Sequence, residues 1–149
     1  MKARQLTYQD LPQITEICKT KSNFTIPSNY IFWMLLRTNG SFCHGTEVNG
    51  NIVAYILSMP TERQGEVFVW QFGIRNFSQN QRAIMDFFIY CKDQLKKHGI
   101  QKISFTAIKE DLPFLEKILM FSFGVKHLEK GTDSFNLERT VENEYFINV

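Results

Sequence analysis

The stretch EVFVWQFGIRNFSQNQRAIMDFFIYCKDQLKKHG, residues 66–99, decides the fold of this chain. It opens with a run, residues 67–74, that carries apolar side chains at both odd and even positions. Alternation along a strand assigns one face to Phe68, Trp70, Phe72 and Ile74, and the opposite face to Val67, Val69 and Gly73. Strands that are buried on both faces have such continuous apolar runs, so we predict the central strand of a sheet here.

A long helix follows this strand after the polar residues 75–79. Its apolar residues recur at helical spacing, at Ala83, Ile84, Phe87, Phe88, Cys91 and Leu95. Ser78 and Gln81 match a capping box at the start, and Gly99 follows the last turn. A strand, a polar loop and a helix start in this order direct free backbone N–H groups at an anion, most often a phosphate.

The residues before this stretch predict two helices and three strands. We expect strands at residues 3–7, 42–48 and 52–58. Asp10 and Ser28 are the expected N-caps of the two helices, the second of which runs to Arg37. The dipeptide Asn49-Gly50 is a strong hairpin signal and joins the second and third strands.

The residues after this stretch predict a strand at 102–108 and a helix that begins at Asp111. Residues 125–128 and 134–137 are expected to pair as a closing hairpin around the turn-like residues 130–133. The amphipathic tail, residues 138–149, has no clear assignment. Together these elements predict a single α/β domain, residues 1–149, on a mixed sheet with at least one parallel strand pair.

The composition is that of an ordinary globular domain of 149 residues, 44% hydrophobic and 21% charged. A formal net charge of +2 argues against a nucleic-acid or anionic-membrane partner. No apolar run reaches the roughly 20 residues that span a bilayer, and the first ten residues lack the apolar segment of a signal peptide. Cys18, Cys43 and Cys91 have no metal-site or disulfide spacing, so we expect a cytoplasmic protein with reduced thiols.

The order of elements, βααβββαβαββ, resembles the Gcn5-related N-acetyltransferase family over nearly the whole chain. The resemblance implies an α/β fold with a mixed, mostly antiparallel sheet, a central pair of strands that splay apart, and flanking helices. It also implies acetyl-CoA as the co-substrate. The histidines, His44, His98 and His127, are scattered along the chain, so we expect no metal. In that family the loop before the long helix follows Arg/Gln-x-x-Gly-x-Gly/Ala and binds the pyrophosphate of coenzyme A.

The corresponding residues here are Gln79, Asn80, Gln81, Arg82, Ala83 and Ile84. Gln79 matches the first position, whereas Arg82 and Ile84 stand where the family has small residues. Arg82 is unfavourable to the helix dipole but favourable beside a diphosphate. The alternative is a loop that has lost the cofactor.

The resemblance implies two further roles for the central strand. Phe72 and Ile74 would lie along the cofactor. A backbone N–H of Phe72 or Gly73 would polarise the thioester carbonyl as an oxyanion donor. Deprotonation of the amine would go through water, because no general base stands out in the sequence.

Within the family, the likeness is to the L-2,4-diaminobutyrate acetyltransferases of ectoine synthesis. It rests on Phe68-Val69-Trp70-Gln71, Ser28-Asn29-Tyr30 and Glu142-Asn143-Glu144-Tyr145-Phe146. Three positions depart from the family. Thr25 replaces an aspartate that holds the substrate amine, Val141 replaces a histidine, and Met120 stands near the place of the usual tyrosine acid.

The resemblance implies five substrate-binding residues: Thr25, Tyr30, Trp70, Gln71 and Glu144. Trp70 and Tyr30 would form an aromatic wall for the amine or lie over its cation, and Glu144 would accept from a second ammonium. Each has a plainer alternative. Trp70 and Tyr30 would be core residues, Glu144 a solvated carboxylate, and Gln71 a structural amide on the strand face opposite Trp70.

These residues point to acetyl transfer to the amine of a small molecule, such as a diamino acid. The degenerate loop and the missing tyrosine support an alternative, a non-catalytic module that binds acyl-CoA or a protein partner. Acylation of a protein N-terminus or lysine also stays open. The resemblance, together with 14 phenylalanines, implies a homodimer.

Overall fold

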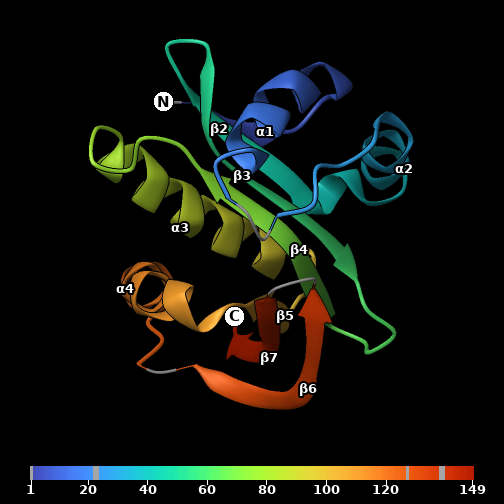
Figure 1. Ribbon diagram of the computed structural model, residues 1–149, viewed down its shortest axis with the longest axis vertical. Coiled ribbons are helices and arrows are strands. Elements are labelled where there is room, and N and C mark those ends of the chain that lie inside the picture. The colour runs from blue at the N-terminus through green and yellow to red at the C-terminus, as the bar shows by residue number, and fades with distance from the viewer. Residues whose placement is uncertain (1, 22–23, 127, 138–139) are drawn as a thin grey trace.

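The structure, a computed structural model, describes residues 2–21, 24–126, 128–137 and 140–149, with the backbone alone at 132–137, 140 and 141. Its strands are β1 (Lys2–Gln5), β2 (Cys43–Val48), β3 (Asn51–Pro60), β4 (Glu66–Ile74), β5 (Lys102–Ala107), β6 (Glu129–Leu137) and β7 (Thr140–Asn148). Its helices are α1 (Leu11–Cys18), α2 (Asn29–Asn39), α3 (Gln81–Lys97) and α4 (Leu112–Phe123). Short 3-10 turns lie at Tyr8–Asp10, Gly40–Phe42 and Lys109–Asp111 (Figure 1).

The seven strands form one sheet in the order β1-β2-β3-β4-β5-β7-β6. The pair β4–β5 is parallel, and the other five pairs are antiparallel. This confirms the mixed, mostly antiparallel α/β sheet with β4 at its centre. The parallel pair needs a crossover, which α3 supplies.

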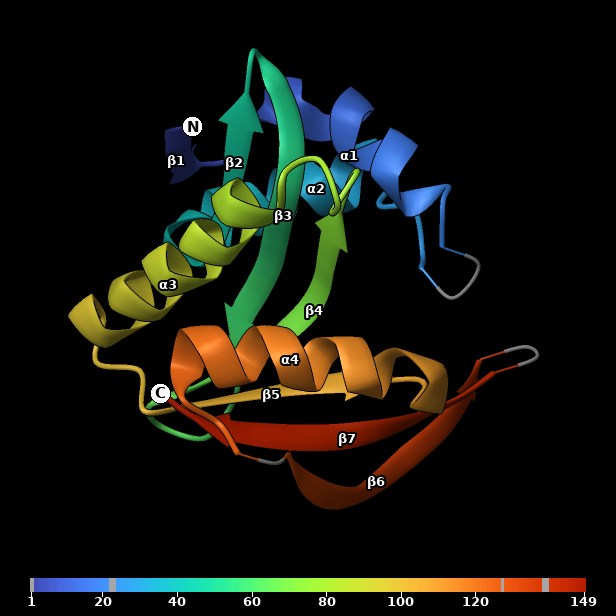
Figure 2. The same ribbon diagram turned by 90° about the vertical axis from the view of Figure 1, so that its left-hand side faces the viewer.

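Two pairs of helices cover the two faces of this sheet. Figure 2 shows α3 and α4 in front of the sheet and α1 and α2 behind it. The larger apolar cluster lies on the α3/α4 face and includes Phe87, Phe105 and Ile118. The smaller one lies on the α1/α2 face and includes Ile14, Phe32 and Tyr55. Strand β4 contributes side chains to both clusters.

A β-bulge in β4 changes the faces that simple alternation predicts. Leu57 of β3 lies opposite Gln71 and Ser58 opposite Val69, so Trp70 is an extra residue. One inserted residue moves the following side chains to the other face. The prediction that Phe68, Trp70, Phe72 and Ile74 share one face is therefore wrong, because the bulge resets the alternation.

The contacts of the β4 side chains show on which face each of them lies. Val67 and Val69 belong to the α3/α4 cluster, and beyond the bulge Phe72 and Ile74 pack against it as well. Trp70 packs against the α1/α2 cluster. Gln71 also points to the α1/α2 face, so it does not lie opposite Trp70 as the sequence predicts.

Most element boundaries confirm the prediction. Asn49 and Gly50 both have positive φ, of 53° and 79°, as a two-residue hairpin turn requires. The Ser28 hydroxyl accepts a hydrogen bond of 3.1 Å from the Ile31 N–H and caps α2. The capping box at Ser78 is wrong, because α3 begins at Gln81 with Asn80 at the N-cap and no side-chain cap bond.

The hairpin predicted at residues 125–137 is also wrong. Residues 129–137 form the single strand β6, which pairs with β7 from the tail. The ladder runs from Lys130 opposite Tyr145 to Ser134 opposite Asn143, four steps on β6 against two on β7. The segment between Lys130 and Ser134, which contains Gly131, therefore stays within β6 and shifts the register of its pairing with β7. Residues 138–139, between β6 and β7 in the sequence, lie outside the described residues.

Candidate functional site

The centre of the sheet opens where β4 and β5 stop pairing. Their parallel ladder runs from Glu66 opposite Lys102 to Val69 opposite Phe105, although β4 continues to Ile74 and β5 to Ala107. Figure 2 shows the two strands diverging beyond this point. A cavity of about 240 Å³ lies in the gap. The splayed central strands that the family resemblance implies are therefore present.

Side chains from both faces of the sheet line this cavity, so it passes between the strands. On the α3/α4 face it is lined by Phe72, Ile74, Phe114 and Leu115; on the α1/α2 face it is lined by Lys21, Phe24, Thr25, Trp70, Gln71 and Gly73. Because the cavity reaches both faces, two molecules that approach from opposite sides would meet within the sheet.

The backbone of β4 offers free polar groups to this gap. The Arg75 N–H donates to the Val53 carbonyl of β3 at 2.8 Å. In an antiparallel ladder the bonded pairs alternate, so Gly73 also turns its N–H and carbonyl toward β3. Phe72 and Ile74 turn theirs the other way, toward the gap. Of the two expected oxyanion donors, the geometry thus favours the N–H of Phe72.

Gln71 is the centre of a buried polar network on the α1/α2 face. Its side chain is only 5% exposed. Its Oε1 accepts from the Tyr55 hydroxyl at 3.1 Å and from the Cys18 thiol at 3.4 Å, and its Nε2 donates to the Thr25 carbonyl. These bonds use both ends of the amide, so Gln71 holds the loop around Thr25 against β4 beside the cavity.

Gly73 makes the approach of Tyr55 possible. A Cβ at Gly73 would lie 2.3 Å from Cε1 of Tyr55 and 2.8 Å from Cγ2 of Ile17. Both distances are far shorter than a carbon–carbon contact. The absence of a side chain at residue 73 therefore lets the Tyr55 ring lie against β4 and reach Gln71.

A carboxylate that the sequence did not single out lies at the cavity. Glu142 of β7 is 7% exposed, lines the cavity and accepts from the Thr106 hydroxyl at 3.0 Å. Glu144, the expected substrate carboxylate, is not among the lining residues and approaches Gly131 of β6 instead. The only signal in the sequence that could have indicated Glu142 is its spacing from Glu144, because residues two apart lie on the same face of a strand.

An ion pair joins two segments at the edge of the cavity. The Lys21 ammonium lies 2.9 Å from the Asp111 carboxylate, and both side chains line the cavity. It connects the loop after α1 with the start of α4. Tyr30, by contrast, is 66% exposed on α2, lies beside Trp33 with the two rings tilted, and is outside the cavity lining.

The start of α3 carries the residues expected to bind phosphate. The first helical bond runs from the Ile84 N–H to the Asn80 carbonyl, which leaves the N–H groups of residues 81–83 at the open helix end. The Arg82 side chain is 96% exposed and lies 3.9 Å from Asp86. Ile84 is fully buried, so this larger residue fits the core instead of filling the phosphate site.

The three thiols are unsuited to nucleophilic attack. Burial raises the pKa of Cys18 and of Cys91, and it raises the pKa of Cys43 to about 11. A thiol with a raised pKa holds little thiolate near neutral pH. Among the described residues, no group of three or more His, Cys, Asp and Glu side chains is arranged to hold a metal ion.

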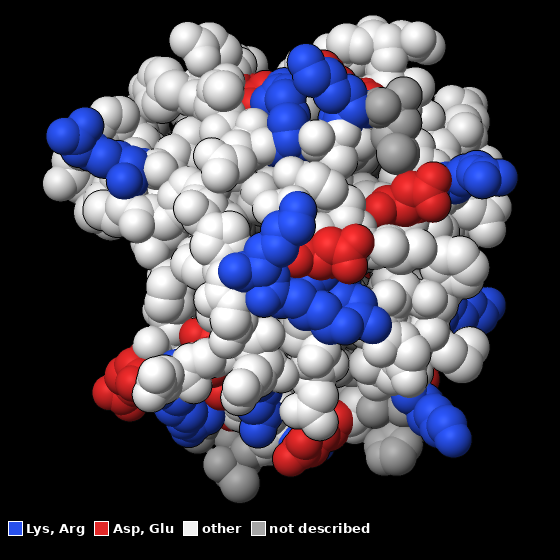
Figure 3. Space-filling model, turned by 180° about the vertical axis from the view of Figure 1, so that it is seen from behind, with Lys and Arg blue, Asp and Glu red and all other residues white. Residues whose placement is uncertain are grey.

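The surface adds two observations. On the face in Figure 3, basic and acidic side chains lie beside one another among other residues, so this face has no continuous basic surface for a phosphate backbone. Within the described chain, every helix is too short or too polar to cross a membrane.

Solved structures share this fold. No protein-family model and no curated protein matches the sequence. Diaminobutyrate acetyltransferase from Paenibacillus lautus, solved with L-2,4-diaminobutyric acid and coenzyme A, superimposes with a TM-score of 0.76 at 19% identity, over 99% of this chain and 93% of that chain.

Two other acetyltransferase structures agree. Ribosomal-protein-alanine N-acetyltransferase from Brucella melitensis has a TM-score of 0.74 at 12% identity, over the whole of both chains. A putative acetyltransferase from Salmonella typhimurium with acetyl-CoA has a TM-score of 0.69 at 12% identity, over 99% of this chain and 92% of that chain. At these identities the likeness establishes the fold, which is that of the Gcn5-related N-acetyltransferases.

Proposed function

We propose that this protein is an acetyl-CoA-dependent N-acetyltransferase that acts on the amine of a small molecule. The observation that carries the proposal is the cavity between the splayed ends of β4 and β5. It is open to both faces of the sheet, and the same strand β4 leads into the exposed helix start that suits a diphosphate. The shared fold with solved acetyltransferases supports the same reading.

The proposed coenzyme A site begins at α3. The N–H groups of residues 81–83 and the extended Arg82 side chain would hold the pyrophosphate, with Gln79 and Asn80 in the preceding loop. The Phe72 carbonyl and the backbone groups of Ile74, which face the gap, would hold the pantetheine arm in the way that a neighbouring strand would be held. The Phe72 N–H stays available for the thioester carbonyl. Acetyl-CoA would supply the activated acetyl thioester there. The exposed donors fit such a ligand.

The proposed amine site lies on the α1/α2 face. Trp70 gives it an apolar wall, the loop at Thr25 closes it, and the Gln71 network holds that loop in place. We assign recognition of a substrate ammonium to Glu142, whose carboxylate lies at the cavity, and not to Glu144. A diamino acid suits this arrangement, since a second ammonium would find the carboxylate. The relative from Paenibacillus lautus, solved with such a ligand, supports this substrate class.

The proposed reaction is direct transfer. The neutral amine attacks the thioester carbon, the carbonyl oxygen becomes an oxyanion beside the Phe72 N–H, and the carbon–sulfur bond breaks to release coenzyme A. The amine loses its proton to water. Holding both molecules in one gap supplies much of the rate enhancement, because the reacting atoms meet without a further loss of translational freedom.

One feature favours a homodimer or another protein partner. The face of α2 exposes Tyr30, Ile31, Trp33 and Met34, and Ile26 is exposed just before it. Contiguous exposed apolar side chains of this kind are typical of interaction sites. We propose a homodimer in the cytoplasm, with sedimentation velocity of the wild type and of Trp33→Glu as the test. A monomer in both cases would remove the proposal.

The non-catalytic alternative rests on the loop with Arg82 and Ile84. A thermal-shift assay with coenzyme A separates the two functions at the first step, because a ligand that binds the folded state stabilises it by mass action. A partner-binding module without a coenzyme site would show no shift. An enzyme would show a shift and would then release thiol with an amine.

The decisive experiment is calorimetric titration of the purified protein with acetyl-CoA. We expect micromolar binding, and about tenfold weaker binding for Arg82→Ala, which loses the charge-assisted bonds. Lys97→Ala, at the exposed far end of the same helix, is the matched control for loss of one positive charge. Absence of binding at millimolar acetyl-CoA would overturn the proposed function.

The amine site has its own test. A panel of small diamines and diamino acids, with detection of released thiol, identifies the acceptor class. Trp70→Ala should then raise the KM for the amine much more than the KM for acetyl-CoA, because Trp70 lines the α1/α2 side of the cavity. Equal effects on both KM values would assign Trp70 to the core.

A further inference from the structure

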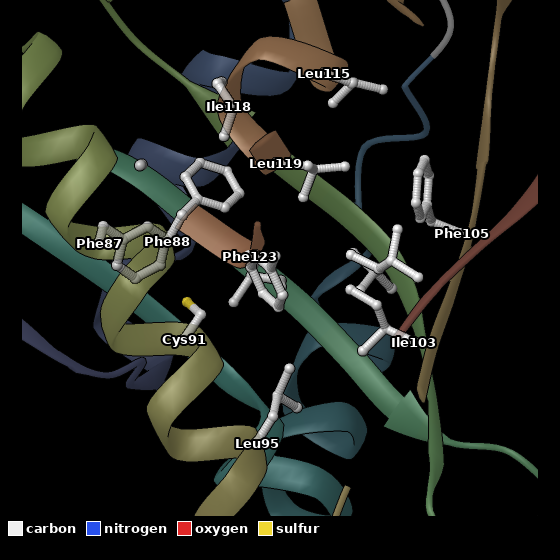
Figure 4. Packing of buried hydrophobic residues seen from close by; sticks show 14 of the residues in the cluster. Phe87, Phe88, Cys91, Leu95, Ile103, Phe105, Leu115, Ile118, Leu119 and Phe123 are labelled. Atoms are coloured by element: carbon white, nitrogen blue, oxygen red, sulfur yellow. The ribbon is translucent and has the colours of Figure 1, made fainter. Parts of the chain in front are cut away.

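A second, smaller cavity lies between the sheet and the helices α3 and α4. Its volume is about 30 Å³. The side chains that line it come from β3, β4, β5, α3 and α4, and all are aliphatic, aromatic or cysteine. Figure 4 shows several of them, including Cys91, Leu95, Ile118 and Leu119, pointing toward one another from the two helices. The cavity therefore offers no hydrogen-bond partner to a water molecule.

This cavity adjoins the gap between β4 and β5. Val69, Phe72, Phe105 and Leu115 line both cavities. Val69 and Phe105 are the last paired residues of the β4–β5 ladder. The small cavity therefore begins at the closed end of the gap, where the proposed acyl group would lie.

An unfilled apolar cavity of this size is unusual in a well-packed interior. Its volume is above the roughly 10–15 Å³ of accessible space that one water molecule needs. Water gains nothing from an apolar wall, so such a hole stays dry and takes an apolar guest instead. Filling it with hydrocarbon restores the dispersion contacts that the lining side chains lack.

The direction of an acyl chain follows from the two faces of β4. On the α1/α2 face, Trp70 and the network at Gln71 occupy the space beside the closed end of the gap. On the α3/α4 face, the Phe72 side chain borders the small cavity. A thioester carbonyl at the Phe72 N–H would thus have its alkyl carbons directed toward α3 and α4.

We propose that the small cavity is an acyl-chain subsite, and that the protein accepts not only acetyl-CoA but also, with tighter binding, an acyl-CoA with one or two carbons more than acetyl. Propionyl-CoA and butyryl-CoA are the donors of this class. The inference rests on the proposed function, because it places the thioester in the gap between β4 and β5. It adds a specificity for the acyl group that the fold alone does not define.

The test compares acetyl-, propionyl-, butyryl- and octanoyl-CoA by calorimetry and by thiol release with one amine. Each buried methylene contributes about 0.8 kcal/mol, a factor of about four. We expect propionyl-CoA to bind about fourfold more tightly than acetyl-CoA, and octanoyl-CoA to gain nothing further. Tightest binding and fastest turnover with acetyl-CoA would overturn the subsite.

Variants of the lining assign the effect to this cavity. Cys91→Val adds about one carbon to the wall, so it should remove the preference for propionyl-CoA. Ile118→Val enlarges the cavity and should move the preference to a longer chain. Ile84→Val is the matched control, because Ile84 belongs to the same core cluster but does not line the cavity.

The outcomes separate the two proposals. If no acyl-CoA and no free coenzyme A binds, the proposed function fails and the subsite fails with it. If all donors bind alike, or if Cys91→Val and Ile118→Val keep the wild-type preference as the control Ile84→Val should, the subsite alone fails. Melting temperatures of the three variants show that each is folded, and Ile118→Val serves if valine at residue 91 prevents folding.

Discussion

The two faces of the sheet stabilise the same strand β4 in different ways. The α3/α4 face buries an almost continuous apolar cluster under two long helices. The α1/α2 face buries a smaller cluster around a polar network of Cys18, Tyr55 and Gln71. The bulge at Trp70 places both Trp70 and Gln71 on the α1/α2 face, while Val69 before it and Phe72 after it pack on the α3/α4 face.

The two faces therefore suit the recognition of different kinds of ligand. Backbone N–H groups and a helix start on the α3/α4 side would recognise a ligand common to many proteins. Individual side chains on the α1/α2 side, each with a specific bond, would recognise one acceptor. Substitutions on the α1/α2 face should therefore be more selective in effect than apolar exchanges on the α3/α4 face, and three predictions test this contrast.

The largest effect is expected for Gly73→Ala. The new Cβ would lie 2.3 Å from the Tyr55 ring, so the ring or the strand must move. Overpacking of this kind lowers the free energy of unfolding by about 3 kcal/mol. Urea unfolding measures the loss. Gly40→Ala is the control, since its φ is −56° and no atom lies within 4 Å of its Cβ. Equal stability of both variants would contradict the close approach.

A smaller loss is expected for Gln71→Leu. The substitution removes the bonds of the Gln71 amide to the Tyr55 hydroxyl and to the Thr25 carbonyl, and leaves the buried hydroxyl with the Cys18 thiol alone. Loss of buried hydrogen bonds of this kind lowers the free energy of unfolding by about 1.5 kcal/mol. The amine KM should rise while the Kd of acetyl-CoA stays constant. Gln101→Leu, at an exposed residue, should change neither. A rise in the acetyl-CoA Kd would show that the two faces are coupled.

The smallest effect concerns pH and a histidine that contacts α3. His44 is buried, its Nε2–H donates to the Ser41 carbonyl at 2.8 Å, and its Nδ1 accepts from the Tyr90 hydroxyl at 3.0 Å. Burial lowers its pKa below the ordinary value of 6.5, against the opposing bond to Ser41, and the charge of His98 lowers it further. The folded protein therefore favours the neutral ring.

The sign of the pH effect follows from this pKa. The unfolded chain takes up a proton near pH 6.5 and the folded protein resists it, so stability is present above pH 6.5 and is lost as the pH falls. We expect a loss of order 1 kcal/mol between pH 7.5 and 5.5. Urea unfolding at several pH values measures it. His44→Gln should flatten this dependence, and an unchanged slope in the variant would assign it to other groups.

Local patterns in the sequence predict much of the fold. Residues 67–74 and 83–95 contain strand and helix periodicities that give β4 and α3, and Asn49-Gly50 gives the hairpin. The register of β6 was missed, because the turn-like residues 130–133 are accommodated in a ladder whose partner comes from the tail. A local signal of turn composition cannot report on a partner that lies elsewhere in the chain.

The candidate site likewise has one part that the sequence predicts and another that it does not. The helix start at residues 79–84 is predicted, because strand, loop and helix are consecutive in sequence. Glu142 is not, because it meets Thr106 across two strands that are 36 residues apart. The position of Trp70 and Gln71 on the same face is not predicted either, because a prediction from the sequence uses unbroken alternation along the strand.

The order of elements up to α4, the central buried strand and the long helix after it follow from local sequence patterns, because periodicity acts between near neighbours in the chain. Tertiary packing alone sets the bulge at Trp70, the position of Glu142 at the cavity and the small apolar cavity at its closed end. These depend on the register of strand pairs and on side chains that meet across the sheet. Their physical cause is packing between distant segments, which a linear pattern does not contain.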